Sequence, residues 1–453
     1  MKICLVTAFP PSGRQLNEYG FHLARELQRN PLVNLTVLGD RLTDYEWSTD
    51  ANGKKLDGVQ QELPGFHVVR CWESDNLGTV LNLARTVRRL KPDVVWFNLV
   101  YSTFATQAHP VAAFAGLCTP ALTRGMGYFT HITLHHILEH VDFAGAGVKQ
   151  ERIFRLGSSL ATRMLLQANS ISVLLSGYQR TLVEKYAAQN VLLATHGTFA
   201  ACPSPPDFSK RGNPDQRILA IGHWGTYKRL ETLMEAFPAV LRRVPTARLI
   251  VAGANHHTKP GYWESIREQY GANPRIEFRG YVPEDDIPGL FSTASIVALP
   301  YDSATGSSGP AHQACEYGVP VVSADIGDFR DMAADEDMAI SFYKTGDPVD
   351  LAAQLIGLLE SPQDQRRAAE QNYAAAIRMT MPHVVRHYLR WFELKRRRRV
   401  LGSSKLGFRR LWGARSSVRS TLHSLPADTF QRAAPQSSLP SIEQEPKSIQ
   451  SPD

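Results

Sequence analysis

The chain has 453 residues, a length that predicts two or three domains. Hydrophobic residues make up 43% of it, but no apolar run reaches the length of a bilayer-spanning helix, and Pro10 and Pro11 interrupt the N-terminal run too early for a signal peptide. The net charge is +7, yet residues 395–419 contain ten Lys and Arg and no acid, so the excess lies in the tail and not in the folded core.

The chain contains five cysteines, which lie far apart and form no CxxC pair. We interpret them as reduced, partly buried thiols, because most of them sit in or beside apolar stretches. Reduced thiols fit a cytoplasmic location, which is the one we expect. The cysteines are Cys4, Cys71, Cys118, Cys202 and Cys315.

The first half of the chain alternates short apolar runs with amphipathic patterns. Such an alternation predicts a parallel sheet that is covered by helices on both faces. The predicted strands are residues 3–8, 35–39, 67–70, 93–98, 132–135, 171–175 and 191–194. The predicted helices are residues 18–29, 79–90, 151–168 and 177–188.

A segment rich in Pro, Gly and Asp, residues 202–216, interrupts this pattern and predicts a linker, after which the alternation restarts. The second set of strands is predicted at residues 218–222, 248–253, 276–279, 295–300, 319–324 and 339–342. Helices are predicted at residues 228–241, 263–270, 287–293, 310–317, 348–359 and 363–399, the last of them broken by Pro382.

Two successive strand–helix arrays predict an α/β protein with two Rossmann-like, doubly wound domains that face a cleft. We expect an N-terminal domain over residues 1–201 and a C-terminal domain over residues 217–380. A helix over residues 381–399 is expected to return to the N-terminal domain. Residues 400–453 are expected to be a basic and then disordered tail.

The most informative segment, residues 218–237, reads ILAIGHWGTYKRLETLMEAF. A strand ends in Gly222, and Lys228 and Arg229 stand at the predicted start of a helix. A cation and free amides at a helix N-terminus can neutralise a diphosphate. The alternative is an ordinary helix start with two solvated cations.

A second segment, residues 299–325, places a Gly- and Ser-rich loop between a strand and a helix. Gly306 and Gly309 permit close backbone approach, and Ser307 and Ser308 can donate from hydroxyl and amide. Pro310 suits the first turn of the following helix. These features are typical of a phosphate cradle, although a turn of small residues that only lets the helix pack has the same composition.

Together these segments resemble the donor-binding domain of the retaining glycosyltransferases of family 4, which have the GT-B fold. The family pattern is a strand ending in Gly, a Lys before a helix of the type LLEAF, then F-x-G-x-V and G-x-P-V-V. Gly222, Lys228 and residues 233–237, 278–282 and 318–322 occupy these places in this order. The resemblance extends over about residues 1–395 and implies that Tyr281 and Val282 lie near the nucleotide base.

The sequence departs from the family at three polar positions. His223 stands where the family has Arg, and Thr305 and Gln313 stand where it has two Glu. Glu316 falls at a different place on the helix. Gln313 can still bind ribose hydroxyls through its amide, and the Ser-Ser-Gly loop indicates a subfamily of its own. The Glu that is replaced by Thr305 usually faces the donor sugar in the family, so the resemblance does not identify the sugar.

In the N-terminal half, residues 9–13 (FPPSG) resemble the family's P-P-x-x-G-G loop, which implies a donor-facing Gly13; an ordinary turn is the alternative. Residues 127–140 contain four histidines. In a strand, residues four apart are separated by about 13 Å, so we expect no zinc site there. The segment ITLH resembles the family's V-T-x-H, which implies that His135, or His136 next to it, lies near the donor sugar.

The resemblance implies transfer of a sugar, with retention, from a nucleoside diphosphate to an acceptor hydroxyl, without a metal or other cofactor. The acceptor is a glycan, a lipid-linked sugar or a small molecule, with polysaccharide or glycolipid synthesis as the candidate role, and no nucleic acid is expected. His135 and Lys228 are the candidate catalytic residues. The candidate donor-binding residues are Gly13, Gly222, His223, Lys228, Arg229, Tyr281, Val282, Ser307, Ser308, Gly309 and Gln313.

Two other functions remain open, a GT-B nucleotide-sugar epimerase and a non-catalytic GT-B assembly partner. A phosphorylase would need a pyridoxal-phosphate lysine, for which the sequence has no motif. The tail over residues 395–419 mixes cations with Leu401, Phe408 and Trp412. That composition suits peripheral contact with an anionic membrane at its inner face, and a solvated linker is the alternative.

Overall fold

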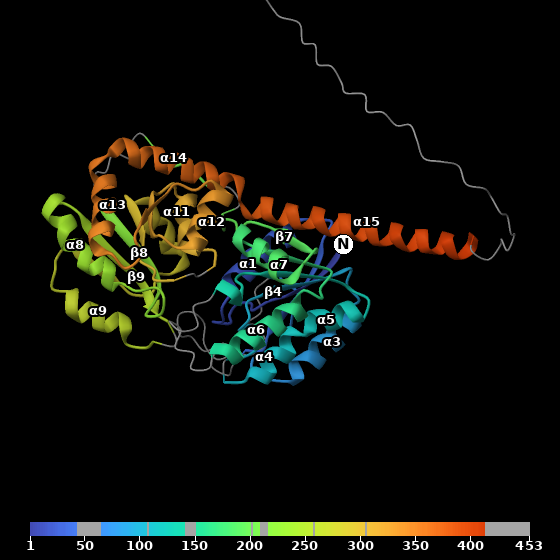
Figure 1. Cartoon of the computed structure of the whole chain (residues 1–453). Coiled ribbons are helices and arrows are strands. Elements are labelled where there is room, and N and C mark those ends of the chain that lie inside the picture. Colours follow the sequence, from blue (N-terminus) through green and yellow to red (C-terminus); the bar gives the residue numbers. More distant parts are fainter. Residues whose placement is uncertain are drawn as a thin grey trace, which may run out of the picture. The chain divides into compact units, whose positions relative to one another are not determined.

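The computed structural model describes residues 1–42, 65–106, 108–140, 151–200, 203–208, 216–256, 259–303 and 306–412. Much of the predicted linker, Cys202, Thr305 and the tail beyond Trp412 therefore lie outside the described residues. The chain forms two compact units, Met1–Arg397 and Arg398–Asp453. The first unit contains two α/β lobes (Figure 1).

The first lobe is built on a parallel sheet with the strand order β3-β2-β1-β4-β5-β6-β7. Its strands are β1 (Lys2–Val6), β2 (Asn34–Asp40), β3 (Val68–Trp72), β4 (Val94–Leu99), β5 (Phe129–Leu134), β6 (Ser170–Val173) and β7 (Val191–Leu193). Its helices are α1 (Asn17–Arg29), α3 (Gly78–Leu90), α4 (Pro110–Leu117), α5 (Thr119–Gly125), α6 (Glu151–Leu165) and α7 (Ser176–Tyr186). The central strands β4 and β5 are buried on both faces, as continuous apolar runs predict.

The second lobe repeats this architecture with the strand order β10-β9-β8-β11-β12-β13. Its strands are β8 (Arg217–Trp224), β9 (Arg248–Asn255), β10 (Ile276–Arg279), β11 (Ile296–Leu299), β12 (Val321–Ala324) and β13 (Ile340–Tyr343). Its helices are α8 (Glu231–Arg243), α9 (Tyr262–Tyr270), α10 (Ile287–Ser292), α11 (Gly309–Glu316), α12 (Gly327–Glu336), α13 (Pro348–Glu360) and α14 (Pro362–Arg378). The prediction of two doubly wound domains is confirmed.

Three helices were not predicted from the sequence, namely α4, α5 and α12. In α4, PVAAFAGL is apolar on every side and shows no amphipathic period. In α5, only seven residues are helical, fewer than two full turns of pattern. In α12, GDFRDMAADE alternates acids with apolar residues and places acids on the buried side as well. Periodicity alone therefore does not find them.

The C-terminal helix α15 (Met381–Trp412) starts in the first compact unit. Its residues Tyr388 and Phe392 pack on Trp96 of β4, with ring centroids 4.6 and 5.1 Å away. The break before it falls at Met379–Thr380, next to Pro382. The expected end of this helix at residue 399 is wrong, because the helix continues to Trp412. Leu, Lys and Arg are good helix formers and carry it through Gly402 and the two serines that follow.

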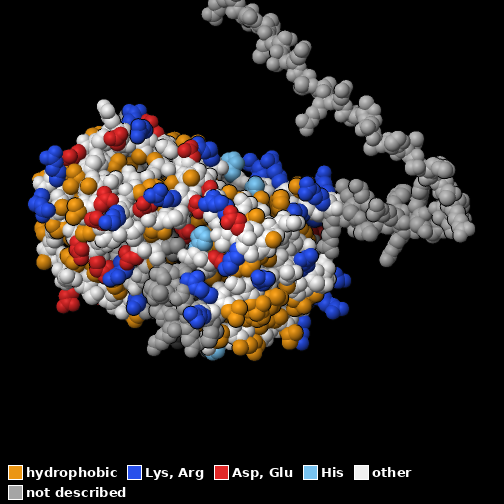
Figure 2. Space-filling view, viewed as in Figure 1, with side chains coloured by type: hydrophobic (Ala, Val, Ile, Leu, Met, Phe, Trp, Pro, Cys, Tyr) orange, Lys and Arg blue, Asp and Glu red, His pale blue; other side chains and the backbone are white. Residues whose placement is uncertain are grey.

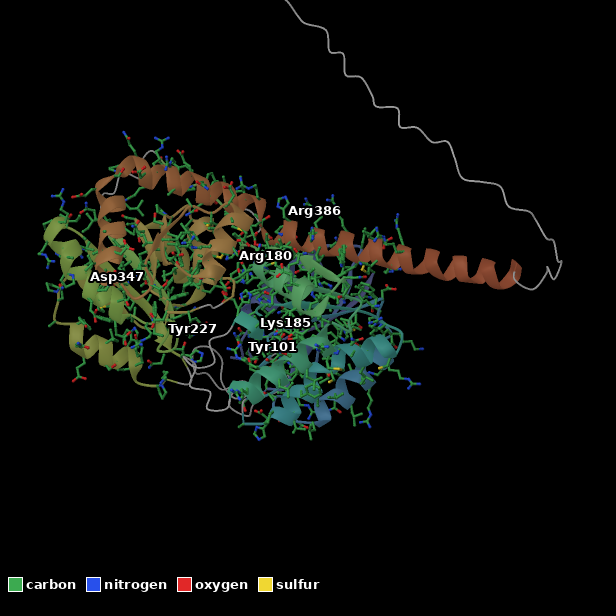
Figure 3. The ribbon with its side chains drawn as sticks, in the orientation of Figure 1. Tyr101, Arg180, Lys185, Tyr227, Asp347 and Arg386 are labelled. Carbon is green, nitrogen blue, oxygen red and sulfur yellow. The ribbon has the colours of Figure 1, made fainter. Side chains whose placement is uncertain are left out.

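Polar contacts join the two lobes where α12 meets α7. Asp335 Oδ2 accepts a hydrogen bond from the Ser176 amide at 2.7 Å, and Asp331 Oδ2 accepts one from the Gly177 amide at 3.0 Å. Arg180, labelled in Figure 3, lies 3.0 Å from Asp331 Oδ1. Carboxylates at a helix N-terminus satisfy free amides and interact favourably with the helix dipole.

The surface shown in Figure 2 is largely polar, apart from an area of apolar side chains over α4, α5 and α6. No helix within the described residues is both long and apolar enough to cross a lipid bilayer.

Two helical glycines provide a test of this packing. A Cβ on Gly116 of α4 would lie 2.3 Å from Phe104 Cβ, whereas a Cβ on Gly157 of α6 would meet nothing within 4 Å. We expect Gly116→Ala to destabilise the protein by about 1–3 kcal/mol through overpacking. Gly157→Ala should stabilise it by about 0.5–1 kcal/mol, because alanine is the better helix former. Urea unfolding of both variants measures the difference, and equal shifts would contradict the described packing of α4.

Candidate active site

The predicted donor residues follow two neighbouring strands at the point where the strand order of the second lobe reverses. One loop follows β8 and the other follows β11, and these strands are hydrogen-bonded to each other. In doubly wound sheets, ligands bind outside the carboxyl ends of the strands at such a switch point. The sheet order therefore brings Lys228 and the Ser307–Ser308 turn to one edge of the sheet.

Backbone hydrogen bonds tie these two loops together. The Asp302 amide donates to Tyr227 O at 2.8 Å, the Arg229 amide donates to Pro300 O at 3.2 Å, and Lys228 and Tyr301 form an antiparallel bridge. The expected start of a helix at Lys228 is therefore wrong. Because residues 227–229 are engaged in this pairing, α8 begins only at Glu231.

The ammonium group of Lys228 lies over the end of β8. A Cβ placed on Gly222 would be 3.9 Å from Lys228 Nζ, and Nζ is 5.0 Å from the centre of the buried Tyr301 ring and 5.9 Å from that of Tyr227. No carboxylate among the described residues forms an ion pair with it. Aromatic rings attract a cation without cancelling its charge, so Lys228 keeps a full positive charge for a ligand.

Unlike Lys228, Arg229 has carboxylate partners. Its Nη2 lies 3.2 Å from Glu231 Oε1 and its Nε lies 3.6 Å from Asp302 Oδ2. The hydrogen bond and charge of Glu231 raise the pKa of Arg229. Arg229 is half exposed and largely compensated, so it contributes less net charge to the site than Lys228 does.

The predicted phosphate loop leads into the N-terminus of α11. Ser308 is the N-cap residue, and its Oγ accepts from the Ala311 amide at 3.5 Å. Ser307 Oγ is shielded from solvent and has no hydrogen-bond partner among the described residues. A Cβ on Gly309 would meet no atom within 4 Å, so the backbone is accessible there. This turn can offer a hydroxyl and helix N-terminal amides to an anion.

A buried ion pair links α11 to α12. His312 Nε2 lies 2.7 Å from Glu336 Oε2, at the end of α12, and both side chains are almost completely buried. Burial alone would lower the pKa of His312, but the Glu336 charge raises it. Gln313, the next residue, is half-buried on α11. Glu316 Oε2 accepts from the Ala200 amide at 3.2 Å and so holds the connection between the lobes.

His135 lies in the first lobe, directly after β5, and its backbone meets the loop that contains Gly306. A Cβ on Gly306 would be 2.8 Å from His135 O and 3.4 Å from His136 Cβ. His135 Nε2 is 2.7 Å from Asn98 Oδ1, and Asn98 Nδ2 donates to Thr7 Oγ1 at 3.0 Å. Nε2 therefore carries the proton, and Nδ1 is the acceptor. Burial lowers the pKa of His135 to about 3, so the ring is neutral at pH 7.

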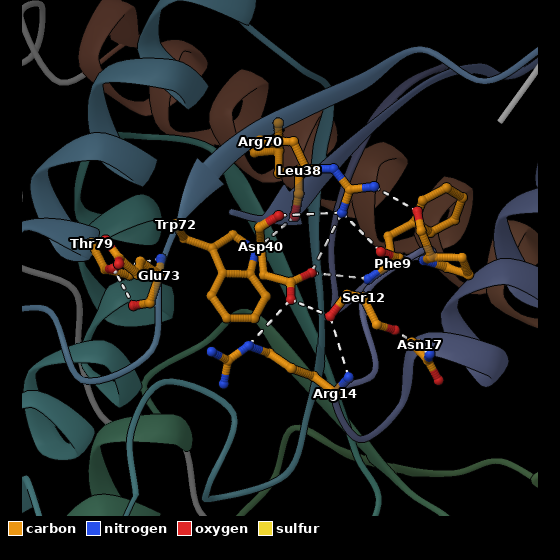
Figure 4. A network of polar contacts seen from close by, with 11 residues as sticks. Phe9, Ser12, Arg14, Asn17, Leu38, Asp40, Arg70, Trp72, Glu73 and Thr79 are labelled. Atoms are coloured by element: carbon orange, nitrogen blue, oxygen red, sulfur yellow. Dashed lines mark hydrogen bonds and ion pairs between the residues drawn. The ribbon is translucent and has the colours of Figure 1, made fainter. Parts of the chain in front are cut away.

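The loop that contains Gly13 is held by a buried carboxylate, as Figure 4 shows. Asp40, the last residue of β2, accepts from Ser12 Oγ at 2.5 Å and from the Phe9 amide at 3.1 Å, and it lies 3.3 Å from Arg14 Nε. Burial raises the pKa of Asp40, against the effect of these hydrogen bonds. Gly13 itself is exposed, and a Cβ there would meet no atom within 4 Å.

Asp40, His312 and Glu336 were not among the predicted residues. The only signal for Asp40 is an acid that ends an otherwise apolar strand, NLTVLGD. Both members of the His312–Glu336 pair lie in helices, and no motif links them. Long-range pairing of this kind leaves no trace in local sequence patterns.

The remaining predicted residues lie at the same edge of the second sheet. His223 is exposed at the end of β8. Tyr281 is exposed and Val282 half-buried, directly after β10, and β9 separates this strand from β8.

In the part of the chain that the structure describes, no group of three or more His, Cys, Asp or Glu is placed to hold a metal ion. Cys4, Cys71, Cys118 and Cys315 are free thiols.

Comparison with known proteins places this site in a recognisable context. Residues 215–361 match the family model described as Glycosyl transferases group 1. The uncharacterized glycosyltransferase MJ1607 of Methanocaldococcus jannaschii is 29% identical over 130 residues, which are 28% of this chain and 32% of that protein. The phosphatidyl-myo-inositol mannosyltransferase of Mycolicibacterium smegmatis is 26% identical over 173 residues, which are 38% of this chain and 42% of that protein. The chain thus aligns with less than half the length of either relative.

Among solved structures, HepE of Anabaena in complex with UDP is similar over 87% of this chain and 100% of its own, with a TM-score of 0.62 and 15% identity. At this identity the likeness concerns the fold, and it confirms the predicted GT-B arrangement of two Rossmann-like domains. The family match supports a transferase domain in the second lobe, the lobe that carries Lys228 and α11.

The buried histidines of the first lobe predict a loss of stability in mild acid. Burial lowers their pKa values from about 6.5 in the unfolded chain, so between about pH 6.5 and pH 4 the unfolded chain binds protons that the folded chain does not. The stabilising effect is complete above pH 6.5 and is lost as the pH falls. These residues are His22 and His136, each with a pKa of about 4, His131 and His135, each with a pKa of about 3, and His196, whose pKa is also lowered.

The free energy of unfolding in urea should therefore fall by several kcal/mol between pH 7 and pH 5, since each such group contributes up to about 1.4 kcal/mol per pH unit. His312 opposes this trend because its pKa is raised. His22→Gln should reduce the slope of the unfolding free energy against pH by the amount that corresponds to about one proton. Substitution of the exposed His67 by Gln serves as the control. If the slope were unchanged in His22→Gln, the buried His22 would not contribute to the loss of stability in acid.

Proposed function

We propose that this protein is a retaining glycosyltransferase of family 4, which moves a sugar from a nucleoside diphosphate to the hydroxyl of an acceptor. One observation carries the proposal. An uncompensated ammonium group, that of Lys228, and the Ser307–Ser308 turn at the start of α11 lie in two loops that are hydrogen-bonded to each other at the switch point of the sheet. Such an arrangement fits a diphosphate.

In the proposed reaction, the bond between the anomeric carbon and the diphosphate oxygen breaks, and its electron pair stays on the diphosphate. Lys228, the Ser307 hydroxyl and the amides at the start of α11 stabilise this growing charge. The acceptor oxygen bonds to the same carbon, and its proton passes to the departing phosphate oxygen. This charge stabilisation requires no metal ion.

His135 is proposed to position the donor sugar or the acceptor and not to act as a base. Its ring is neutral, and its Nε2 donates to Asn98, so Nδ1 can accept a hydrogen bond from a sugar hydroxyl. A ring with a pKa of about 3 is too weak a base to remove a proton from a hydroxyl. The neutral ring also adds no charge that would compete with Lys228 for the diphosphate.

The comparisons guide the choice of substrates. The family match includes all predicted donor-binding residues from Gly222 to Gln313. Because HepE was crystallised with UDP, UDP-sugars are the first donors to test. The mannosyltransferase of M. smegmatis is named for a lipid acceptor, and we propose a lipid-linked or polysaccharide acceptor for this chain, with the basic residues 395–419 at an anionic membrane.

The role of Lys228 can be tested by Lys228→Met, which keeps the aliphatic stem over Gly222 and removes the charge. We expect kcat to fall by about 10²–10³-fold, as for the loss of one preorganised group that stabilises the transition state. Arg229→Gln should lower kcat less, because Glu231 and Asp302 already compensate its charge. Turnover at saturating UDP-sugar is the measurement. Equal effects of the two substitutions would contradict the assignment.

The loop can be tested by binding. We expect UDP to bind more tightly than uridine monophosphate, and Ser307→Ala to weaken UDP binding about tenfold to a hundredfold, the value of one hydrogen bond to a charged group. Ser265→Ala, on the exposed face of α9, is the matched control. Isothermal titration calorimetry with UDP, GDP and ADP also identifies the base. Unchanged UDP affinity in Ser307→Ala would exclude this hydroxyl from the site.

A further inference from the structure

Four helices of the first lobe leave apolar side chains exposed on the outside of the protein. The helices α3, α4, α5 and α6 pack against one another, and Figure 2 shows the apolar area over α4, α5 and α6, with Lys and Arg side chains around it. Val111 and Leu156 are 70% and 75% exposed. The members used below are Leu77, Leu81, Val111, Leu122, Leu156 and Leu160, which we call the leucine–arginine face together with the arginines of the same helices.

Helix α3 has an apolar side that the fold does not use. Leu83 and Val87 point into the core, as expected for a helix on a sheet. Leu77 and Leu81 are more than half exposed instead, and Arg85 follows after four further residues. Residues three or four apart lie on one side of a helix, so this exposed stripe runs from leucine to arginine along α3.

Helix α6 repeats this pattern. Leu156 and Leu160 are exposed, and Arg152 and Arg163 stand four residues before and three residues after them. The four side chains therefore share one side of the helix. The opposite side, with Ala161 and Leu165 among others, is buried in the core. Two helices that both contact α4 and α5 thus present leucines bordered by arginines.

The helices of this face carry mostly positive charge, and the acids nearest to it are Glu73 and Asp75, which precede Leu77. The residues of α3, α4 and α5 include Arg85, Arg88, Arg89 and Arg124 but no Asp or Glu, and α6 has a single acid, Glu151, at its first position. Arg85, Arg88 and Arg89 form no ion pair with a described residue. Within the described residues this charge is therefore left to solvent, and an anionic surface is complementary to it.

We propose that the leucine–arginine face docks on the anionic surface of a lipid bilayer. Exposed leucines can enter the boundary between headgroups and acyl chains, and arginines bind lipid phosphates. Each cation near an anionic leaflet strengthens binding severalfold. This surface is separate from the basic tail over residues 395–419, and the proposal does not depend on the proposed sugar transfer.

Two other occupants fit this face less well. A second copy of the chain, related by a twofold axis, would bring two copies of the same predominantly positive patch together. A protein partner is disfavoured because the face contains leucine and valine in place of tryptophan and tyrosine, and leucine and valine are under-represented among the residues that contribute most to binding at protein interfaces. A bilayer needs only apolar area and positive charge, and this face provides both.

The test is sedimentation of the full-length protein with vesicles of phosphatidylcholine, with and without phosphatidylglycerol. Wild type should bind the vesicles that contain phosphatidylglycerol. The double substitution Leu156→Ser and Leu160→Ser should weaken this binding about tenfold or more, because two leucines lose their transfer into the apolar boundary. Leu32→Ser, at an equally exposed leucine outside the face, should bind like wild type.

A second variant tests the charge. Arg85→Gln combined with Arg88→Gln should weaken binding to the anionic vesicles about fivefold or more and lower its dependence on salt. Equal binding of wild type and the leucine variant would overturn the proposal, whichever other part of the chain holds the protein on the vesicle. The proposal would also be refuted if wild type were a dimer that does not bind vesicles and the leucine variant were a monomer, because the face would then be a protein interface.

Discussion

The antiparallel pairing of residues 227–229 with residues 300–302 determines where the charge of the candidate site lies. It holds the loops after β8 and β11 together, and it places the ammonium group of Lys228 beside the rings of Tyr227 and the buried Tyr301. The same pairing delays the start of α8 until Glu231. A lysine in a free helix terminus would share its charge with solvent and nearby acids. Here the backbone fixes its stem over Gly222 while its charge stays uncompensated.

The first lobe contributes to this site through neutral groups. His135 is uncharged, and its proton is committed to Asn98, so it offers an acceptor atom and no positive charge. Its carbonyl lies close to Gly306, where a side chain would collide with it. Asp328 accepts hydrogen bonds from the Gly306 amide at 2.9 Å and from Tyr178 Oη at 2.6 Å, and thereby holds the loop against the first lobe. Cationic and neutral parts of the site thus come from different lobes.

Sequence patterns were sufficient for the architecture, because strands buried on both faces are continuous apolar runs and the helices between them are amphipathic. They failed where an element has no such pattern, as in α4 with apolar residues on every side. They also failed where a distant segment decides the local structure, as when Tyr301 pairs with Lys228. The motif residues could be proposed from spacing alone. Their supports, Asp40 and the His312–Glu336 pair, depend on partners in other elements and have no local signature.

The contact between α7 and α12 consists of carboxylates that receive hydrogen bonds from helix amides, an arginine and a tyrosine hydroxyl. Water can replace each of these partners, so breaking such a bond in solvent costs only about 1–3 kcal/mol. Parting the two lobes here exposes polar groups that water solvates well, together with apolar residues of the buried cluster that extends through both lobes. Each polar bond of this contact therefore adds little to the free energy of parting the lobes, and the affinity of a nucleotide that touches both lobes would depend partly on whether these bonds form again around it.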